Sequence, residues 1–458
     1  MNQIIHETRG LLRLALPLAA AQAGLQLMGV VDTAVIGRLG AEELAAVGLG
    51  NALFFTVFIA AMGVVMGIDP LTAQAFGARD PILARRVLWQ GVWLAIIVGG
   101  AVSVPLAFSP LMLAPFGVQA SIIPEASIYT TLRIVGLIPM LLFVVFRSYL
   151  QAQGITRPMV ISIAVANVFN LVADIYFVFG GGWLPEWTGP LRLMPAYGVA
   201  GAAVATIISS IVQLWILWIA VRSVRPSERT HEPWRLVPRE FRQAFNIGLP
   251  LGLQFGAEVG IFALVGLLAG RLGADHLAAH QIAITLAAFT FTVAVGIGAA
   301  ASVRVGHAIG AEDAPGTRRA GLVAFAVGAA VMSCGAITFW LFPEFLASLL
   351  SDKPAVILAS VPLLAVAAVF QISDGIQAVG AGVLRGAADT RFAFVANILG
   401  HWLIGLPVAL YLGVHLEMGI VGLWWGLCTG LTAVAALLLI RFLRTSARPI
   451  ARVVHAEG

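Results

Sequence analysis

The sequence predicts an all-α polytopic membrane protein, with twelve transmembrane helices in two six-helix lobes related by a parallel pseudo-twofold repeat. The first observation is composition: 60% of the 458 residues are hydrophobic and 11% are charged, whereas about a quarter are charged in soluble domains. The second is that apolar stretches of about 20 or more residues, long enough to cross a hydrocarbon core, recur along the chain. The third is an internal repeat at an offset of about 233 residues.

The repeat is visible in short identical segments. Leu-Pro at 16–17 returns at 249–250, Gly-Arg-Leu-Gly-Ala at 37–41 returns at 270–274, and Leu-Ala-Ala at 44–46 returns at 277–279. Six spans per copy is an even number, so both copies enter the membrane in the same sense. The pseudo-twofold axis therefore lies along the membrane normal, as in transporters built from parallel repeats with their working site at the seam.

The twelve spans follow from the apolar runs in order. Those of the first copy are expected at 11–36, 45–75, 87–108, 128–150, 158–179 and 198–221, and those of the second at 245–269, 277–309, 320–342, 355–384, 392–412 and 419–442. The polar, proline-containing stretch between the copies is typical of a linker. We therefore expect an N-terminal six-helix lobe at 1–222, a cytoplasmic inter-lobe linker at 223–240 and a C-terminal six-helix lobe at 241–458.

The arginines indicate the orientation. Basic residues gather near 9–13, 79–86, 157, 222–242, 318–319, 391 and 441–452, whereas 109–124 and 413–418 carry few positive charges. Since Lys- and Arg-rich connections stay inside, both termini are expected in the cytoplasm. This bias also explains the net charge of +5, so no nucleic-acid partner is expected.

Little in the sequence favours an enzyme or a cofactor protein. Cys334 and Cys428 stand singly in apolar runs, so neither a disulfide nor a metal cluster is expected. No His-Glu-x-x-His, Gly-x-Ser-x-Gly or paired-Asp motif falls in a suitable helix. We expect no enzymatic activity and no cofactor other than a coupling ion.

Four acidic residues inside predicted spans are the main functional candidates: Asp32, Asp174, Glu258 and Asp374. A mid-span acid costs about 2.5 to 3.5 kcal/mol on insertion scales and tends to face a cavity or a partner. The repeat does not preserve these charges, because Asp32 falls opposite Val265 and Glu258 opposite Leu25. This indicates a distinct polar site in each lobe; the alternative is that an acid only makes an interhelical hydrogen bond.

Asn167, Asn170 and Asp174 follow the spacing i, i+3, i+7, which places them on one helix face. Oxygen ligands grouped in this way suit a hard cation such as Na+, or a shared proton. The residue types alone do not choose between the two ions. Five further residues are candidates to line a cavity for flat cations, although phenylalanine is also common on lipid-facing surfaces: Phe54, Phe255, Phe289, Phe370 and Gln371.

Several of these segments together resemble the multidrug and toxic compound extrusion (MATE) transporters over essentially the full length. Glu258 with Ala-Ala-His-Gln at 278–281, Arg-Val-Gly-His at 304–307, and Asp374 with Gly-Val-Leu-Arg-Gly at 382–386 are similar to the NorM-type branch. Asp174 and the run 71–78 resemble the DinF-type branch instead. The resemblance implies a Na+ site at Glu258 and Asp374, or at Asp32, Asn170 and Asp174. It also matches Asn167 and Asn170 to the amides that the family carries in its fifth helix.

The resemblance also implies a function. It predicts export of hydrophobic organic cations such as drugs and dyes, by antiport against inward Na+ or H+ and with alternating access, across the bacterial inner membrane and in contact with its lipids. A monomer is sufficient, because the repeat already supplies two lobes. The alternative from another class is a flippase for lipid-linked precursors. Such a protein needs basic residues in its cavity, whereas the mid-span charges here are mostly acidic.

Overall fold

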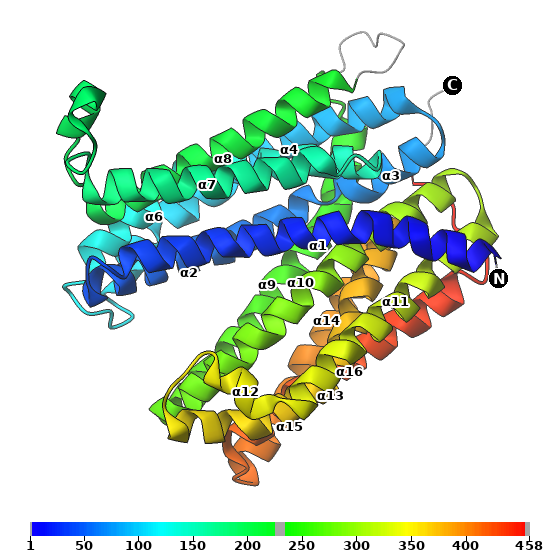
Figure 1. Cartoon of the computed structure of the whole chain (residues 1–458). Coiled ribbons are helices and arrows are strands. Elements are labelled where there is room, and N and C mark those ends of the chain that lie inside the picture. The colour runs from blue at the N-terminus through cyan, green and yellow to red at the C-terminus, as the bar shows by residue number, and fades with distance from the viewer. Residues whose placement is uncertain (1, 225–233, 454–458) are drawn as a thin grey trace. The chain divides into compact units, whose positions relative to one another are not determined.

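In the computed structural model, which describes residues 2–224 and 234–453, every regular element is a helix (Figure 1). Twelve helical stretches are long and apolar enough to cross a membrane, which confirms the predicted all-α class. The first half contains α1 (Asn2–Ile36), α2 (Ala41–Val65), α3 (Ile68–Gly77), α4 (Pro81–Phe108), α5 (Pro110–Leu113), α6 (Ile123–Ala152), α7 (Arg157–Phe179), η1 (Glu186–Leu193) and α8 (Gly198–Ser223).

The second half repeats this order. It contains α9 (Pro238–Leu272), α10 (Ala274–Gly310), α11 (Ala314–Leu341), α12 (Pro343–Ser348), α13 (Pro354–Gly386), α14 (Thr390–Asn397), η2 (Ile398–Gly405), α15 (Leu406–Leu410), η3 (Tyr411–His415) and α16 (Gly419–Thr445). Pro17 in α1 and Pro250 in α9 occupy matching interior positions. Both are tolerated because an apolar helix with packed neighbours can absorb one missing backbone bond.

Two predicted spans are interrupted. The span expected at 45–75 breaks at Met66 and Gly67, between α2 and α3. A side chain at Gly67 would collide with the backbone of Gly248, so glycine allows the two segments to approach. The span expected at 392–412 contains two π-helical stretches, η2 and η3. Pro407 lies two residues after the end of η2, and because proline cannot donate to the preceding turn, the helix widens before it.

The chain forms two compact units. The C-terminal unit comprises the described residues of Met1–Gln22, Asp69–Leu83 and Leu249–Gly458, and the N-terminal unit comprises Ala23–Ile68 and Ala84–Gly248. The partition follows packing rather than chain order, since the first part of α1 lies against α10, where Gly296 meets Ala19. The expected division into 1–222 and 241–458 stays a prediction. Of the expected linker, residues 225–233 lie outside the described residues.

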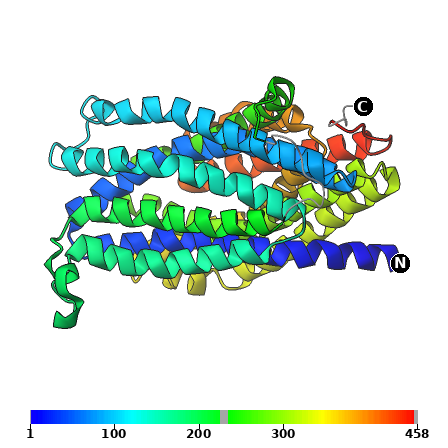
Figure 2. The same ribbon diagram turned by 90° about the horizontal axis from the view of Figure 1, so that it is seen from above.

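The part of the linker that is described packs on α4. Gln90 donates to the carbonyl of Arg235 at 2.9 Å and accepts from the backbone of Val237 at 3.0 Å, while Trp93 donates to the carbonyl of Trp234 at 2.8 Å. In the same unit α7 lies beside α8, as both views show (Figure 2). The contact with α8 supports α7, the helix that carries Asp174.

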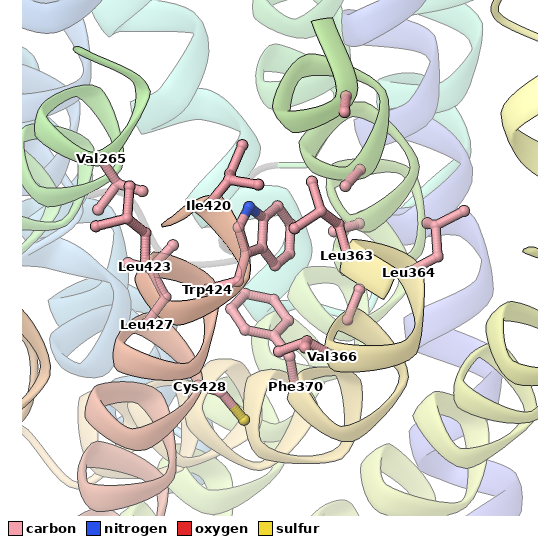
Figure 3. Close-up of a cluster of buried hydrophobic side chains, with 14 of the residues drawn as sticks. Val265, Leu363, Leu364, Val366, Phe370, Ile420, Leu423, Trp424, Leu427 and Cys428 are labelled. Carbon is pink, nitrogen blue, oxygen red and sulfur yellow. The ribbon is translucent and has the colours of Figure 1, made fainter. Parts of the chain in front are cut away.

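A hydrophobic core of the C-terminal unit gathers around Trp424 (Figure 3). Trp424 on α16 packs against Phe370 on α13, with ring centroids 5.9 Å apart. Phe370 lies one helical turn before Asp374, so the core holds α13 firmly at the position of that acid.

Candidate functional site

The four predicted acids lie in two clusters, one in each unit. The first carboxylate cluster contains Asp32 on α1, Asn170 and Asp174 on α7, and Thr206 on α8. The second carboxylate cluster contains Glu258 on α9, Asp374 and Gln377 on α13, and Asn397 on α14.

The first cluster is built around two buried carboxylates. Asp174 is fully buried and Asp32 is 8% exposed, and the two carboxyl groups interact electrostatically. Thr206 donates to one oxygen of Asp32 at 3.3 Å. The other oxygen of Asp32 and both oxygens of Asp174 have no hydrogen-bond partner among the described residues. The two carboxylates therefore offer three buried acceptor oxygens to a proton or a cation.

The amides of α7 take different roles. Asn170 is fully buried, one turn before Asp174 on the same face, and neither atom of its amide has a partner within the described residues. The amide nitrogen of Asn167 donates to the carbonyls of Gly24 on α1 and of Ile163, each at 2.9 Å. The predicted helix face thus brings Asn170 and Asp174 into the cluster, while Asn167 ties α7 to the backbone of α1.

The second cluster surrounds Glu258. Its two oxygens accept from the amide nitrogens of Gln377 at 3.2 Å and of Asn397 at 3.4 Å. Asp374 is buried, lies one turn before Gln377, and interacts electrostatically with Glu258. The amide oxygens of Gln377 and Asn397 have no partner in the described part of the chain.

Both clusters have the chemistry of a hard-cation or proton site. Their ligand atoms are carboxylate, amide and hydroxyl oxygens, which Na+ and other hard cations prefer, and unpartnered buried oxygens are costly unless a ligand satisfies them. Among the described residues, no three His, Cys, Asp or Glu side chains come together as a metal site. A bound cation would therefore use amide oxygens as well as carboxylates.

At two matching positions of the repeat, one copy carries an acid and the other carries an aliphatic side chain. Val265, which corresponds to Asp32, is fully buried in the core around Trp424 (Figure 3). Leu25, which corresponds to Glu258, is partly buried in α1. The same scaffold position thus supports a polar site in one unit and packing in the other, as the sequence asymmetry predicts.

One polar contact is nevertheless shared by the two repeats. In the N-terminal unit, Asn167 donates to the carbonyl of Gly24; in the C-terminal unit, the indole nitrogen of Trp402 donates to the carbonyl of Ala257 at 3.2 Å. Gly24 and Ala257 are matching positions of the repeat. In each unit the fifth span is therefore tied to the first, and in the C-terminal unit this contact lies next to Glu258.

Sequence reasoning missed the partners of the acids. Thr206, Gln377 and Asn397 are neutral, and such residues are too common in helices to stand out. Arg133 was also missed, although it is a charged residue within the apolar run at 128–150. It lies near Asp174 with Tyr129, and the signal that could have found it is the one that identified the acids.

The residues predicted to line a cavity occupy different environments. Phe54, Phe370 and Gln371 are buried, Phe255 is half-buried and Phe289 is 69% exposed. Gln371 and Thr290 are hydrogen-bonded to each other through their side chains. Their assignment to a cavity stays a prediction.

Comparison with known proteins finds a family that this chain matches. A family model described as MatE matches residues 17–176 and 250–411, one segment in each repeat. The multidrug resistance protein NorM of Burkholderia vietnamiensis is 36% identical over 443 residues, covering 95% of this chain and 93% of the relative. A protein of Deinococcus radiodurans named as a probable multidrug resistance protein NorM is also 36% identical, with 95% of each chain covered.

Solved structures agree on the fold. The eukaryotic MATE transporter AtDTX14 superposes with a TM-score of 0.83 at 20% identity, covering 97% of this chain and 98% of that chain. A MATE crystallised in complex with MaL6 gives a TM-score of 0.86 at 20% identity, with 96% of each chain covered. None of these matches favours the flippase alternative.

Proposed function

Because the chain belongs to the MatE family, we propose that it exports hydrophobic organic cations by antiport against inward Na+ or H+. It is a multi-pass membrane protein and a transporter of the multidrug-efflux kind, not an enzyme. We also propose that it transports by alternating access and lies in the bacterial inner membrane with both termini in the cytoplasm. It acts as a monomer in this scheme.

The observation that carries the proposal is the pair of carboxylate clusters with unsatisfied oxygens inside apolar helices. Asp174 has no hydrogen-bond partner for either oxygen among the described residues. A charged side chain at the centre of a bilayer costs about 2.5 to 3.5 kcal/mol on insertion scales, and such residues usually mark ion or substrate pathways. A purely structural acid would instead be satisfied by neighbouring donors.

Transport then follows from competition. A carboxylate that takes up the coupling ion loses its attraction for a cationic substrate, and the conformation favoured by the new occupant becomes dominant. Either ligand shifts that equilibrium only by its different affinity for the two conformations. Inward movement of each positive charge across about 100 mV contributes roughly 2.3 kcal/mol.

The residues that would hold the ion differ between the units. In the first cluster a cation would contact Asp32, Asp174 and Asn170; in the second it would contact Asp374 and Glu258, with the amide oxygens of Gln377 and Asn397 completing the shell. A proton would instead be shared between the carboxyl groups of Asp32 and Asp174. Each arrangement uses oxygens that are already unpartnered or only weakly bonded.

The test is efflux of a fluorescent cationic dye from proteoliposomes, with a Na+ gradient and a pH gradient imposed separately. Efflux that follows only one gradient identifies the coupling ion. Asp174→Asn and Asp374→Asn are compared with the wild-type protein at equal incorporation, and the variant that abolishes efflux identifies the cluster that couples. Efflux that neither gradient drives, or that both variants leave unchanged, would overturn the proposal.

A further inference from the structure

Arg133 is a guanidinium well inside the membrane-spanning helix α6. Arg133 is 5% exposed and lies in a helix that runs from Ile123 to Ala152. Arginine is almost never buried without a partner that compensates its charge. The side chains around Arg133 should therefore show what it does.

Aromatic rings hold this guanidinium. Its central carbon lies 4.4 Å from the ring centroid of Phe54 on α2 and 5.6 Å from that of Tyr129. One terminal nitrogen donates to the hydroxyl of Tyr129 at 3.2 Å. Both aromatic residues are fully buried. The ring face of Phe54 attracts the cation without neutralising it.

No carboxylate forms an ion pair with Arg133 among the described residues. The first carboxylate cluster is nevertheless close. Tyr129, which accepts from Arg133, packs in one buried cluster with Val35 on α1, Val178 on α7 and Ala202 on α8, which lie about one turn from Asp32, Asp174 and Thr206. The cation is thus close to the first carboxylate cluster, but its contacts are with the aromatic rings.

Because of Arg133, the surroundings of the two clusters differ in charge. When all carboxyl groups are ionised, the first cluster holds two negative charges beside one guanidinium. The second cluster holds two negative charges, and Glu258 accepts from neutral amides. Arginine carries a positive charge in proteins, so with all four acids ionised the surroundings of the first cluster carry one negative charge fewer than the second cluster. One monovalent cation therefore neutralises the first cluster together with Arg133.

We propose that Arg133 is a tethered counter-cation that determines how many coupling ions the first cluster takes and how tightly. With Arg133 present, the cluster binds a single monovalent cation. When that cation leaves, the guanidinium still offsets part of the negative charge of the cluster. The protein can therefore return to its other conformation with the cluster empty. This inference rests on the proposed function, since it describes how the cluster handles the coupling ion.

The chemistry predicts what each substitution does. Arg133→Gln removes the positive charge, so the cluster should hold its cation more tightly, with a half-saturating concentration lowered about tenfold or more. Arg133→Lys keeps the charge and should stay within about threefold of wild type, although lysine cannot reproduce the planar stacking on Phe54. Phe54→Leu keeps the arginine but removes the ring that holds it, so the guanidinium can move to the acids and weaken cation binding.

The experiment records currents from reconstituted protein on a solid-supported membrane after two separate jumps. One jump raises Na+ at constant pH, and the other lowers the pH without Na+. The jump that produces current in wild type identifies the ion, and its concentration dependence gives the half-saturating concentration. Arg147→Gln, the same change further along α6, is the matched control and should leave the value unchanged. Size-exclusion profiles and thermal unfolding confirm that each variant is folded.

The outcomes separate the two proposals. If wild type responds, Asp174→Asn weakens the response and Arg133→Gln tightens binding while Arg147→Gln does not, the counter-cation role is supported. If Arg133→Gln and Phe54→Leu both give the wild-type value while Asp174→Asn still weakens binding, the role of Arg133 is overturned and the proposed function stands. If wild type responds to neither jump, the proposed function fails, and the inference fails with it.

Discussion

Arg304 on α10 holds Glu7 on α1 by two parallel hydrogen bonds. The Nε atom donates to Oε1 at 2.8 Å, and Nη2 donates to Oε2 at 2.6 Å. The side chain of Glu7 is only 8% exposed and that of Arg304 is 29% exposed. This bidentate geometry is the strongest form of an arginine–carboxylate contact. It holds the first part of α1 within the C-terminal unit.

We expect Glu7→Gln to lower the free energy of unfolding by about 1 to 3 kcal/mol, because it removes a charge-assisted contact and leaves the guanidinium partly buried without its counter-charge. The measurement is thermal unfolding in detergent micelles, followed by tryptophan fluorescence. The control is Glu186→Gln, which breaks a pair with Arg192 whose side chains are 91% and 43% exposed. That exposed pair should contribute about 0 to 1 kcal/mol. Equal losses in the two variants would contradict the prediction.

Gln377 should set the affinity of the second cluster. Its amide donates to Glu258, and its free oxygen is available to a cation. Gln377→Leu removes both, so the half-saturating concentration of the coupling ion should rise about tenfold, in line with the loss of a hydrogen bond to a charged group.

The concentration dependence of dye efflux measures this change. Gln3→Leu is the matched control, since it removes an exposed hydrogen bond to Arg319 far from either cluster in the sequence. A value for Gln377→Leu that equals the control would show that Glu258 does not depend on this amide.

The span pattern and the acids were predictable because each is a local property. An apolar run long enough to cross a membrane adopts a helix whatever it packs against, since lipid offers no partner for free backbone groups. A carboxylate within such a run, as at Asp32 or Asp374, is visible without knowledge of its neighbours. The break at Gly67 was not predicted, because it depends on the backbone of Gly248, far along the chain.

The partners of the acids depend on contacts between distant segments. Thr206 and Asp32 are 174 residues apart, and Asn397 and Glu258 are 139 apart. A threonine or an asparagine in a helix more often bonds to its own backbone, as many do here, so its type does not reveal a partner. Arg133 differs, since its charge was visible in the sequence and only its closeness to Asp174 required the structure.

The hydrogen bond from Trp402 to the carbonyl of Ala257 should position Glu258, the next residue. Trp402→Phe keeps a ring but removes the donor, so we expect a loss of stability of about 0.5 to 1.5 kcal/mol and a half-saturating ion concentration raised about threefold. The matched control is Trp425→Phe, because the indole of Trp425 donates no hydrogen bond to the described residues and is 37% exposed. A change in stability without a change in ion affinity would show that the contact supports the fold but does not position Glu258.

Gly298 on α10 should be indispensable because the backbone of α13 lies against it. A methyl group there would come within 2.6 Å of the carbonyl oxygen of Ala378, one turn after Asp374. Alanine favours a helix over glycine by up to about 1 kcal/mol, but the collision should outweigh this gain, and we expect Gly298→Ala to lower the free energy of unfolding by about 1 to 3 kcal/mol. Gly100→Ala in α4 tests the same substitution where nothing lies within 4 Å, and should be neutral or stabilising. Thermal unfolding of both variants decides the matter: if Gly298→Ala is as stable as Gly100→Ala, α10 and α13 are not in close backbone contact beside Asp374.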